Sequence, residues 1–325
     1  MRVLVTGATG LVGNNVARML LDQGHSVRVL TRATSDRRPL SGLEVEQAQG
    51  DVRDAASVMA AADGVDAVVH AAAQVQIGWT GLELSRAINV EGTRNVARSA
   101  RERRLRMVHV SSVDALGLGS ADSPACEETP PLGGVLCPYV ITKREAEQVI
   151  LEEVGQGLQA SIVNPAYMLG PWDWKPSSGR MLLHVANGWA LFAPLGQNSF
   201  CDVRDVAGGI VAALERGQPG RRYVLAGETL SYFQAWRIFA EVTGARRPRF
   251  PIGPLVRIGA GWCGDLWTKL SGREGDVNSA ATAIAAQKRC YSSARAEAEL
   301  GYRRRPVRES AEAAWSWFRE YGYAK

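Results

Sequence analysis

A strand-like apolar run that leads directly into three evenly spaced glycines constrains this chain more than any other feature. The run Val3–Val5 precedes Gly7, Gly10 and Gly13, and a helix-like pattern starts at the last glycine. Glycine permits a tight turn, a close approach of backbone N–H groups to a phosphate, and close packing of a helix on a strand. A helix N-terminus also favours negative charge. The segment therefore predicts a strand–loop–helix unit that holds the pyrophosphate of a dinucleotide.

The first half of the chain alternates short apolar runs with helix-length patterns. Such alternation predicts parallel strands joined by crossover helices, and hence an α/β fold with a doubly wound, Rossmann-type parallel sheet. Ligands bind such a sheet at the carboxyl ends of its strands. We expect strands at Arg2–Thr6, Val27–Thr31, Val45–Gln49, Ala67–Ala71, Met107–Ser111, Ala160–Asn164 and Arg222–Ala226. We expect helices at Gly13–Gln23, Ala55–Ala61, Thr93–Arg101, Val140–Glu152, Val203–Arg216 and Glu309–Tyr321.

The regular alternation ends near Pro165, and helical patterns dominate after Gly227. We therefore expect two parts. Residues 1–165, completed by 200–226, would form the dinucleotide-binding domain. Residues 166–199 and 227–325 would form a smaller, mainly helical lobe that binds the substrate.

Composition excludes several classes of protein. The chain has 325 residues, of which 46% are hydrophobic and 22% charged, and these values are typical of a globular protein. No apolar stretch approaches the roughly 18–20 residues that span a bilayer. No basic and apolar leader precedes the first strand. We expect a cytoplasmic protein without an integral membrane segment.

Cysteine, histidine and arginine patterns narrow the possible partners. Five scattered cysteines lack CxxC spacing and four histidines lack HExxH spacing, so we expect free thiols and no metal site. The net charge is +5, and basic clusters occur at 101–106, 246–249 and 303–305. None is interleaved with aromatic residues as a nucleic-acid groove would be. We expect solvated surface there and no nucleic-acid partner.

The end of the second strand indicates which dinucleotide is bound. Where an acidic residue would hold the ribose 2′-hydroxyl of NAD, the sequence has Arg32, with Arg37 and Arg38 close behind. An arginine at this place can pair with the 2′-phosphate of NADP. The alternative is a surface arginine in an arginine-rich chain. We predict NADP in preference to NAD.

Tyr139 and Lys143 are the candidate acid–base pair. They lie four residues apart at the start of a helical pattern, which puts both side chains on one face. A nearby ammonium group favours the phenolate and lowers the pKa of a tyrosine toward neutral pH. Such a tyrosine can exchange a proton with a hydroxyl or a carbonyl. Alone, the spacing is also compatible with a packed tyrosine and a solvated lysine.

A third polar residue follows the Met107–Ser111 strand. Ser111 and Ser112 place two hydroxyls at its carboxyl end. The alternative for Ser112 is a strand-end serine that caps its own backbone. Ser112, Tyr139 and Lys143 follow successive strands in this order, so we expect them to form one site.

Taken together, these motifs resemble the extended short-chain dehydrogenase/reductase family. The opening Thr6–Gly13 matches its T-G-x-x-G-x-x-G, and Asn89–Thr93 matches its N-V-x-G-T. Phe200–Ala207 resembles its F-x-D-V-x-D-V-A segment. One departure is Thr142, where serine is usual. Within the family, the chain is similar to bacterial dihydroflavonol-4-reductase-like proteins and hopanoid-associated sugar epimerases.

The resemblance assigns roles to the candidate residues. Ser112 would orient the substrate oxygen, and Asp51 would contact adenine. Lys143 would also hold the nicotinamide ribose, which follows from the family and not from the spacing. The resemblance implies that the dinucleotide is held by Thr6, Gly7, Thr9, Gly10, Leu11, Val12, Gly13, Arg32, Arg37, Asp51, Val52, Ala71, Ala72, Ala73, Tyr139, Lys143, Asn164 and Pro165.

Three kinds of reaction are known in this family, and the sequence favours one. Dehydratases carry an Asp-Glu pair directly after the hydroxyl residue, whereas this chain has Val113 and Asp114 there. Asp114 is either a helper acid or a strand-end cap. We expect an NADP(H)-dependent oxidoreductase that acts on a bulky, apolar carbonyl or alcohol. An NAD-dependent nucleotide-sugar epimerase is the first alternative, and a non-enzymatic NADP-binding regulator is the second.

The second lobe carries the signals about the substrate and the partners. We expect its tryptophans to cover the cleft, at Trp172, Trp174, Trp189, Trp262 and Trp267. An apolar stripe over 254–270 is more typical of core packing, but it could also form a lid that touches a membrane. The resemblance further implies a homodimer formed through Thr93–Arg101 and Val140–Glu152.

Overall fold

The computed structural model describes residues 1–188 and 191–324. Its strands are β1 (Arg2–Thr6), β2 (Ser26–Thr31), β3 (Val45–Gln49), β4 (Ala67–His70), β5 (Arg106–Val110), β6 (Gln159–Pro165), β7 (Tyr167–Leu169), β8 (Phe192–Ala193), β9 (Gln197–Asp202), β10 (Arg222–Leu225), β11 (Glu228–Ser231) and β12 (Phe250–Pro251). Its α-helices are α1 (Leu11–Asp22), α2 (Ala55–Ala61), α3 (Leu82–Arg86), α4 (Gly92–Glu102), α5 (Pro138–Gly155), α6 (Gly179–Ala186), α7 (Val203–Arg216), α8 (Tyr232–Thr243), α9 (Pro254–Ser271), α10 (Ser279–Ile284), α11 (Ala294–Leu300) and α12 (Val307–Glu320). Single turns lie at η1 (Arg38–Leu40), η2 (Ala87–Glu91) and η3 (Val113–Ala115).

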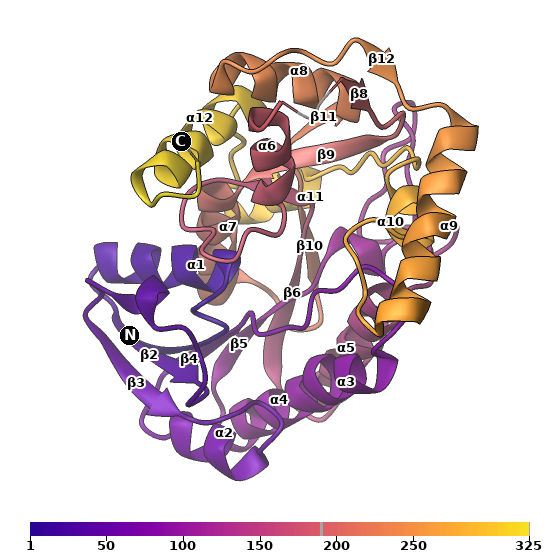
Figure 1. Ribbon diagram of the computed structural model, residues 1–325. Helices are drawn as coiled ribbons and strands as arrows, with labels where there is room; N and C mark the ends of the chain where they lie inside the picture. The colour runs from indigo at the N-terminus through magenta and orange to yellow at the C-terminus, as the bar shows by residue number, and fades with distance from the viewer. Residues whose placement is uncertain (189–190, 325) are drawn as a thin grey trace.

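A parallel sheet of seven strands organises the molecule (Figure 1). Its order is β10-β6-β5-β4-β1-β2-β3, and every neighbouring pair is parallel. The chain therefore starts in the middle of the sheet, winds to one edge and then to the other. This is the doubly wound, Rossmann-type fold expected from the sequence.

Helices cover both faces of this sheet, because its strands are apolar on both sides. Helices α1 and α7 pack together on one face, over a core that includes Val5, Leu20 and Ile210. Helices α2, α4 and α5 cover the other face, over Leu4, Met107 and Ile162. The strand β10 completes the sheet from residues 200–226, as expected.

The second lobe contains more β-structure than the sequence suggested. A three-stranded sheet of order β11-β9-β7 and a pair β12-β8 carry helices α6, α8 and α12. Their shared core includes Phe200, Phe239 and Phe318, each at most 1% exposed. Three of these strands, β7, β8 and β12, have only two or three residues, too few for alternation to reveal them.

Local signals explain where the main helices begin. Asp54 and Asp202 cap α2 and α7 by accepting hydrogen bonds from the backbone two residues later. Ser231 and Gln234 form a reciprocal capping box at the start of α8. Pro138 occupies the first turn of α5, where its missing N–H costs nothing. Among the described residues, no helix combines the length and the apolar character that crossing a membrane requires.

Candidate active site

The glycine loop between β1 and α1 is built so that side chains are excluded from two of its glycine positions. Gly7 has φ +76°, and a Cβ there would lie 2.6 Å from the Ala72 nitrogen. A Cβ at Gly13 would lie 2.3 Å from the Gly7 carbonyl oxygen. Gly10 caps α1 without any side-chain hydrogen bond, and the first turn of α1 holds no acid. The arrangement leaves the N-terminus of α1 available to an anion.

The end of β4 is fixed against this loop. The Thr6 hydroxyl hydrogen-bonds with Nδ1 of His70 at 2.7 Å and accepts from the Ala72 nitrogen at 3.3 Å. Burial lowers the pKa of His70 to about 3, so its ring is neutral near pH 7. The half-buried small side chains of Ala71, Ala72 and Ala73 follow. The predicted cofactor residues at the ends of β1 and β4 thus adjoin one another.

The ends of β2 and β3 form a positively charged corner. Asp36 is paired with Arg38, and Asp51 is paired with Arg53 at 2.7 Å. These acids are therefore already engaged. Arg32 and Arg37 are exposed, and neither forms an ion pair within residues 1–188 and 191–324. Val52 is buried against Gly92, where a Cβ would lie 2.8 Å from its Cγ2.

The predicted catalytic side chains lie at the carboxyl edge of β5 and the first turns of α5. The Lys143 ammonium is buried, donates to the Val110 carbonyl at 2.9 Å and lies 6.0 Å from the centre of the Tyr139 ring. Ser112 follows β5 and donates to Oδ2 of Asp114 at 2.9 Å. Ser112 also accepts from the Asp114 nitrogen at 3.1 Å, so it is a cap as well.

The pKa of Tyr139 is raised, whereas the sequence analysis expected it to be lowered. Burial and the Asp114 carboxylate raise the pKa of Tyr139 above its ordinary value, while the Ser112 hydroxyl acts in the opposite direction. Lys143 does not produce the expected lowering, because its ammonium group turns to the Val110 carbonyl. Burial lowers the pKa of Lys143 to about 8. Near pH 7 the phenol is therefore protonated and the lysine charged.

Two residues of this site were missed by the sequence analysis. Arg289 is 6% exposed and forms an ion pair with Asp114, and the same carboxylate accepts a hydrogen bond from Ser112. Nothing in the sequence around Arg289 indicates this pairing, which joins positions 175 residues apart. Glu147 accepts from Ser111 at 2.5 Å and from Asn164 at 2.6 Å. Its spacing of four residues from Lys143 was a usable signal.

Two buried asparagines connect the segments of the site by hydrogen bonds. Asn164 is fully buried and donates to the Ser112 carbonyl at 2.9 Å. Asn89 joins the loop after β4 to α5, since it accepts from the Gln74 nitrogen at 2.7 Å and donates to the Thr142 hydroxyl at 3.0 Å. The contacts of Asn164 are structural, and its part in cofactor binding, like that of Pro165, stays a prediction.

The described tryptophans of the second part of the chain lie in two places, and that they cover the cleft stays a prediction. Trp172 and Trp174 pack with Trp317 and Tyr321 in an aromatic cluster of the second lobe, and Arg18 stacks on Trp172 at 3.2 Å. They are used for packing because four aromatic rings bury more apolar surface together than apart. Trp262 and Trp267 are exposed on α9. Trp189 lies outside the described residues.

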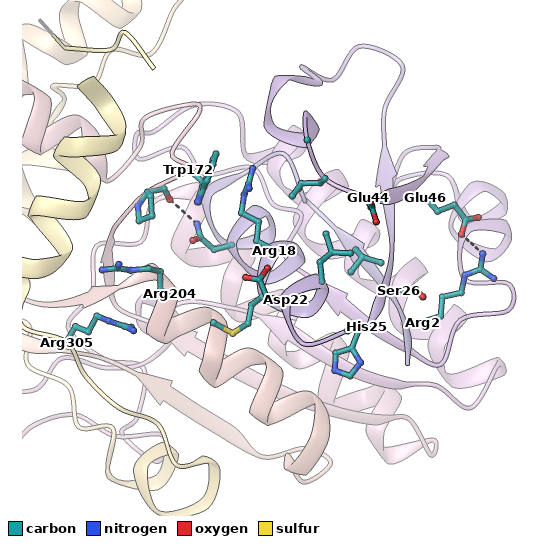
Figure 2. Close-up of a pocket in the computed structure, with 18 residues that line it drawn as sticks. Arg2, Arg18, Asp22, His25, Ser26, Glu44, Glu46, Trp172, Arg204 and Arg305 are labelled. Carbon is teal, nitrogen blue, oxygen red and sulfur yellow. Dashed lines mark hydrogen bonds and ion pairs between the residues drawn. The ribbon is translucent and has the colours of Figure 1, made fainter. Parts of the chain in front are cut away.

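One cavity is separate from these residues (Figure 2). It has a volume of about 1180 Å³ and runs along α1 to the starts of β1 and β2. Arg204 and Arg305, which line it, are paired with Asp202 and Asp205. It contains neither the glycine loop nor Ser112, Tyr139 or Lys143. The candidate active site is therefore at the opposite edge of the sheet.

Comparison with known proteins agrees with this fold. The profile of the NAD dependent epimerase/dehydratase family matches residues 3–226. "Sterol demethylase protein B" of Methylococcus capsulatus is 36% identical over 99% of both chains. A "putative dihydroflavonol 4-reductase" of Synechocystis is 32% identical over 99% of this chain and 95% of its own. The crystal structure of gox2253 has a TM-score of 0.87 at 36% identity and covers 99% of both chains.

A Rossmann sheet with a glycine loop and a Ser-Tyr-Lys constellation defines an NAD(P)-dependent enzyme that acts by oxidation and reduction or by epimerisation. The chain belongs to the NAD-dependent epimerase/dehydratase family of extended short-chain dehydrogenases/reductases.

Proposed function

We propose that this protein is an NADP(H)-dependent reductase that converts a carbonyl of a bulky, apolar small molecule into an alcohol, or catalyses the reverse oxidation. The observation that carries the proposal is the surroundings of the Tyr139 phenol. Tyr139 packs with Cys137, Val140 and Ala280, and Ile77, Val135 and Ile284 adjoin this cluster. Ser112 and Asp114 bring polar groups to the phenol. An apolar wall with few convergent polar groups suits an apolar ligand.

The glycine loop fits a dinucleotide, because Gly7 and Gly13 leave no room for a Cβ and the α1 N-terminus lacks a side-chain cap. Arg32 and Arg37 support the choice of NADP, since no acid near them is free to bind a ribose hydroxyl. The same proposal divides the chain as expected from the sequence. Residues 1–165 and 200–226 bind the dinucleotide, and 166–199 and 227–325 bind the substrate.

When bound, the nicotinamide supplies or accepts the hydride at the reacting carbon. Tyr139 gives its proton to the carbonyl oxygen, and its raised pKa keeps the phenol protonated for this step. Ser112 turns its hydroxyl from Asp114 to the same oxygen and orients it. Charged Lys143 is held by its bond to the Val110 carbonyl and binds the nicotinamide ribose, the other role that the resemblance gives it.

The names of the relatives support the substrate class. One is named for sterol demethylation and another for dihydroflavonol reduction, both of which concern bulky ring systems. Nucleotide-sugar epimerisation with NAD is the second candidate, since the family is described by that activity. Dehydration is disfavoured because Val113 stands where dehydratases carry an acid. A homodimer through α4 and α5 is part of the proposal as well.

Turnover with NADPH tests the proposal. Purified protein is assayed with sterol ketones, long-chain ketones and nucleotide sugars, beside Tyr139→Phe and the control Tyr321→Phe on the far lobe. Loss of a positioned acid costs about 100- to 10,000-fold in rate. We expect that loss in Tyr139→Phe, with an apolar ketone as the preferred substrate. Efficient turnover of nucleotide sugars without net oxidation of NADPH would instead favour the epimerase.

A further inference from the structure

Helix α9 presents an apolar face to solvent. The side chains of that face are between 41% and 84% exposed, and they are Leu255, Val256, Ile258, Trp262, Leu266, Trp267 and Leu270. Among the exposed residues of α9, all of which the structure describes, the one charged side chain is Lys269. We call these seven side chains the α9 face. The apolar stripe of the sequence is thus an outer surface, and core packing, the interpretation that the stripe favoured, is wrong.

The opposite side of α9 is small and polar, and it packs on α10 and the loop before it. A Cβ at Gly264 would lie 1.8 Å from the Val277 carbonyl oxygen, and one at Gly261 would lie 2.8 Å from Oγ1 of Thr282. Oδ1 of Asp265 accepts from the Ser279 nitrogen at 3.0 Å. A helix rotated to bury its apolar face would lose these close contacts. The outward direction of the α9 face is therefore built into the packing.

Exposed arginines lie in the chain shortly before and after α9. Arg246, Arg249 and Arg273 are exposed, and none of them forms an ion pair within the described part of the chain. Nearby acids are engaged elsewhere, since Glu274 accepts from the backbone of Trp79 and Thr80. Asp276 pairs with Arg180. Tryptophans and leucines flanked in the chain by arginines match the interface of a bilayer that carries anionic headgroups.

We propose that the α9 face docks this protein on the surface of an anionic phospholipid bilayer, with α9 lying along the interface. Figure 1 shows α9 along one side of the molecule, where a flat surface can reach its whole length. A second copy of this chain is a poorer occupant, because it would bring the same positive charges against Arg246, Arg249 and Arg273.

Docking would place the bilayer next to the active site. Helix α10 lies between α9 and the start of α5, because α10 packs on α9 and its Ala280 contacts the cluster of Tyr139 and Val140. An apolar substrate could then pass from the bilayer to Tyr139 along α10 without crossing water. This last step rests on the proposed function, whereas docking itself does not.

Binding to vesicles tests the proposal without any assay of activity. The protein is floated with vesicles of phosphatidylcholine alone and with vesicles that also contain phosphatidylglycerol. Trp262→Ser/Leu266→Ser removes apolar surface from the α9 face, and Leu84→Ser on α3, where Leu84 is 49% exposed, is the matched control. Arg246→Gln/Arg249→Gln removes charge alone and leaves α9 unchanged. Circular dichroism checks that each variant is folded.

We expect the unchanged protein and Leu84→Ser to bind the anionic vesicles, and Trp262→Ser/Leu266→Ser to bind about tenfold less or weaker still. Arg246→Gln/Arg249→Gln should lose binding to the anionic vesicles, whereas its behaviour with vesicles of phosphatidylcholine alone should match that of the unchanged protein. Cys263, which is exposed on α9 next to Trp262, gives a second readout. An environment-sensitive fluorophore on it, in a Cys126→Ser background, should shift to the blue with anionic vesicles.

Two results would overturn the proposal. One is that the unchanged protein floats with neither kind of vesicle, or that the α9 variant floats as well as Leu84→Ser. The other is that the α9 variant turns a stable dimer into a monomer while vesicles are not bound, which would make the face a contact between copies. If the unchanged protein binds vesicles but does not reduce ketones, that result contradicts the proposed function and leaves the docking proposal standing.

Discussion

Single residues of the site differ in how far the sequence determines their state. Tyr139 and Lys143 are placed together by helix spacing, but their pKa values depend on burial and on Asp114, which only the tertiary structure supplies. Arg289 comes from a segment that no local pattern connects with β5. The proximity of Tyr139 and Lys143 was thus predictable, and their electrostatic environment was not.

The lysine makes a pH-dependent contribution to stability that can be measured. Its pKa is about 8 in the folded protein against an ordinary value of 10.5. Below pH 8 both states are protonated, whereas between about pH 8 and 10.5 the unfolded state binds more protons, so the contribution of Lys143 to stability rises with pH. The free energy of unfolding of the unchanged protein, relative to Lys143→Met, should rise by a few kcal/mol over this window.

Urea unfolding of both proteins at several pH values between 7 and 10.5 gives this difference. Other titrating groups cancel, because both proteins contain them. A difference that stays flat or falls over the window would show that Lys143 keeps its ordinary pKa.

Whole elements of the first domain follow closely from their patterns. The strands at Arg2–Thr6 and Val45–Gln49 and the helices at Ala55–Ala61 and Val203–Arg216 have the bounds that the sequence predicted. The short strands β7, β8 and β12 were not predictable, since two or three residues carry no periodicity and their pairing is with distant segments. Helix α9 is a third case, because its apolar stripe correctly predicted a helix, but the apolar side chains face outward.

The glycine loop gives a prediction at the scale of this element. Gly13→Ala would place a methyl group 2.3 Å from the Gly7 carbonyl oxygen, so the backbone of β1 and α1 must separate. We expect a loss of about 1–3 kcal/mol in stability together with loss of dinucleotide binding. Gly10→Ala is the matched control for stability, because its Cβ meets the same oxygen at 3.4 Å, an ordinary contact.

Thermal unfolding and fluorescence titration with NADPH report the two effects. Equal stability of Gly13→Ala and Gly10→Ala would mean that close approach of helix and strand is not what Gly13 provides.

On the scale of the whole molecule, segments far apart in the chain meet at the candidate active site. The ion pair of Asp114 with Arg289 joins the end of β5 to the segment after α10. Both side chains are largely buried, and Ser112 depends on the same carboxylate. Contact between the end of β5 and this distant segment therefore also positions the Ser112 hydroxyl.

Replacing Asp114 by asparagine tests this junction. The change leaves the Arg289 guanidinium buried without a carboxylate, so we expect a loss of about 3–5 kcal/mol in the free energy of unfolding. Asp63→Asn breaks the exposed pair with Arg103 and should cost less than about 1 kcal/mol. If chemical denaturation gives similar losses for the two variants, the buried pair does not hold the parts together.

We propose that the Rossmann domain is shaped for NADP and not for NAD, and equilibrium titration with NADPH and NADH tests this most directly. The protein is first checked by mass spectrometry for retained cofactor, and Arg32→Asp is titrated beside it. We expect exchangeable binding of NADPH and much weaker binding of NADH. In Arg32→Asp the binding preference should move toward NADH, because an acid there can accept a hydrogen bond from the ribose hydroxyl. Tightly retained NAD, or a preference that Arg32→Asp leaves unchanged, would contradict it.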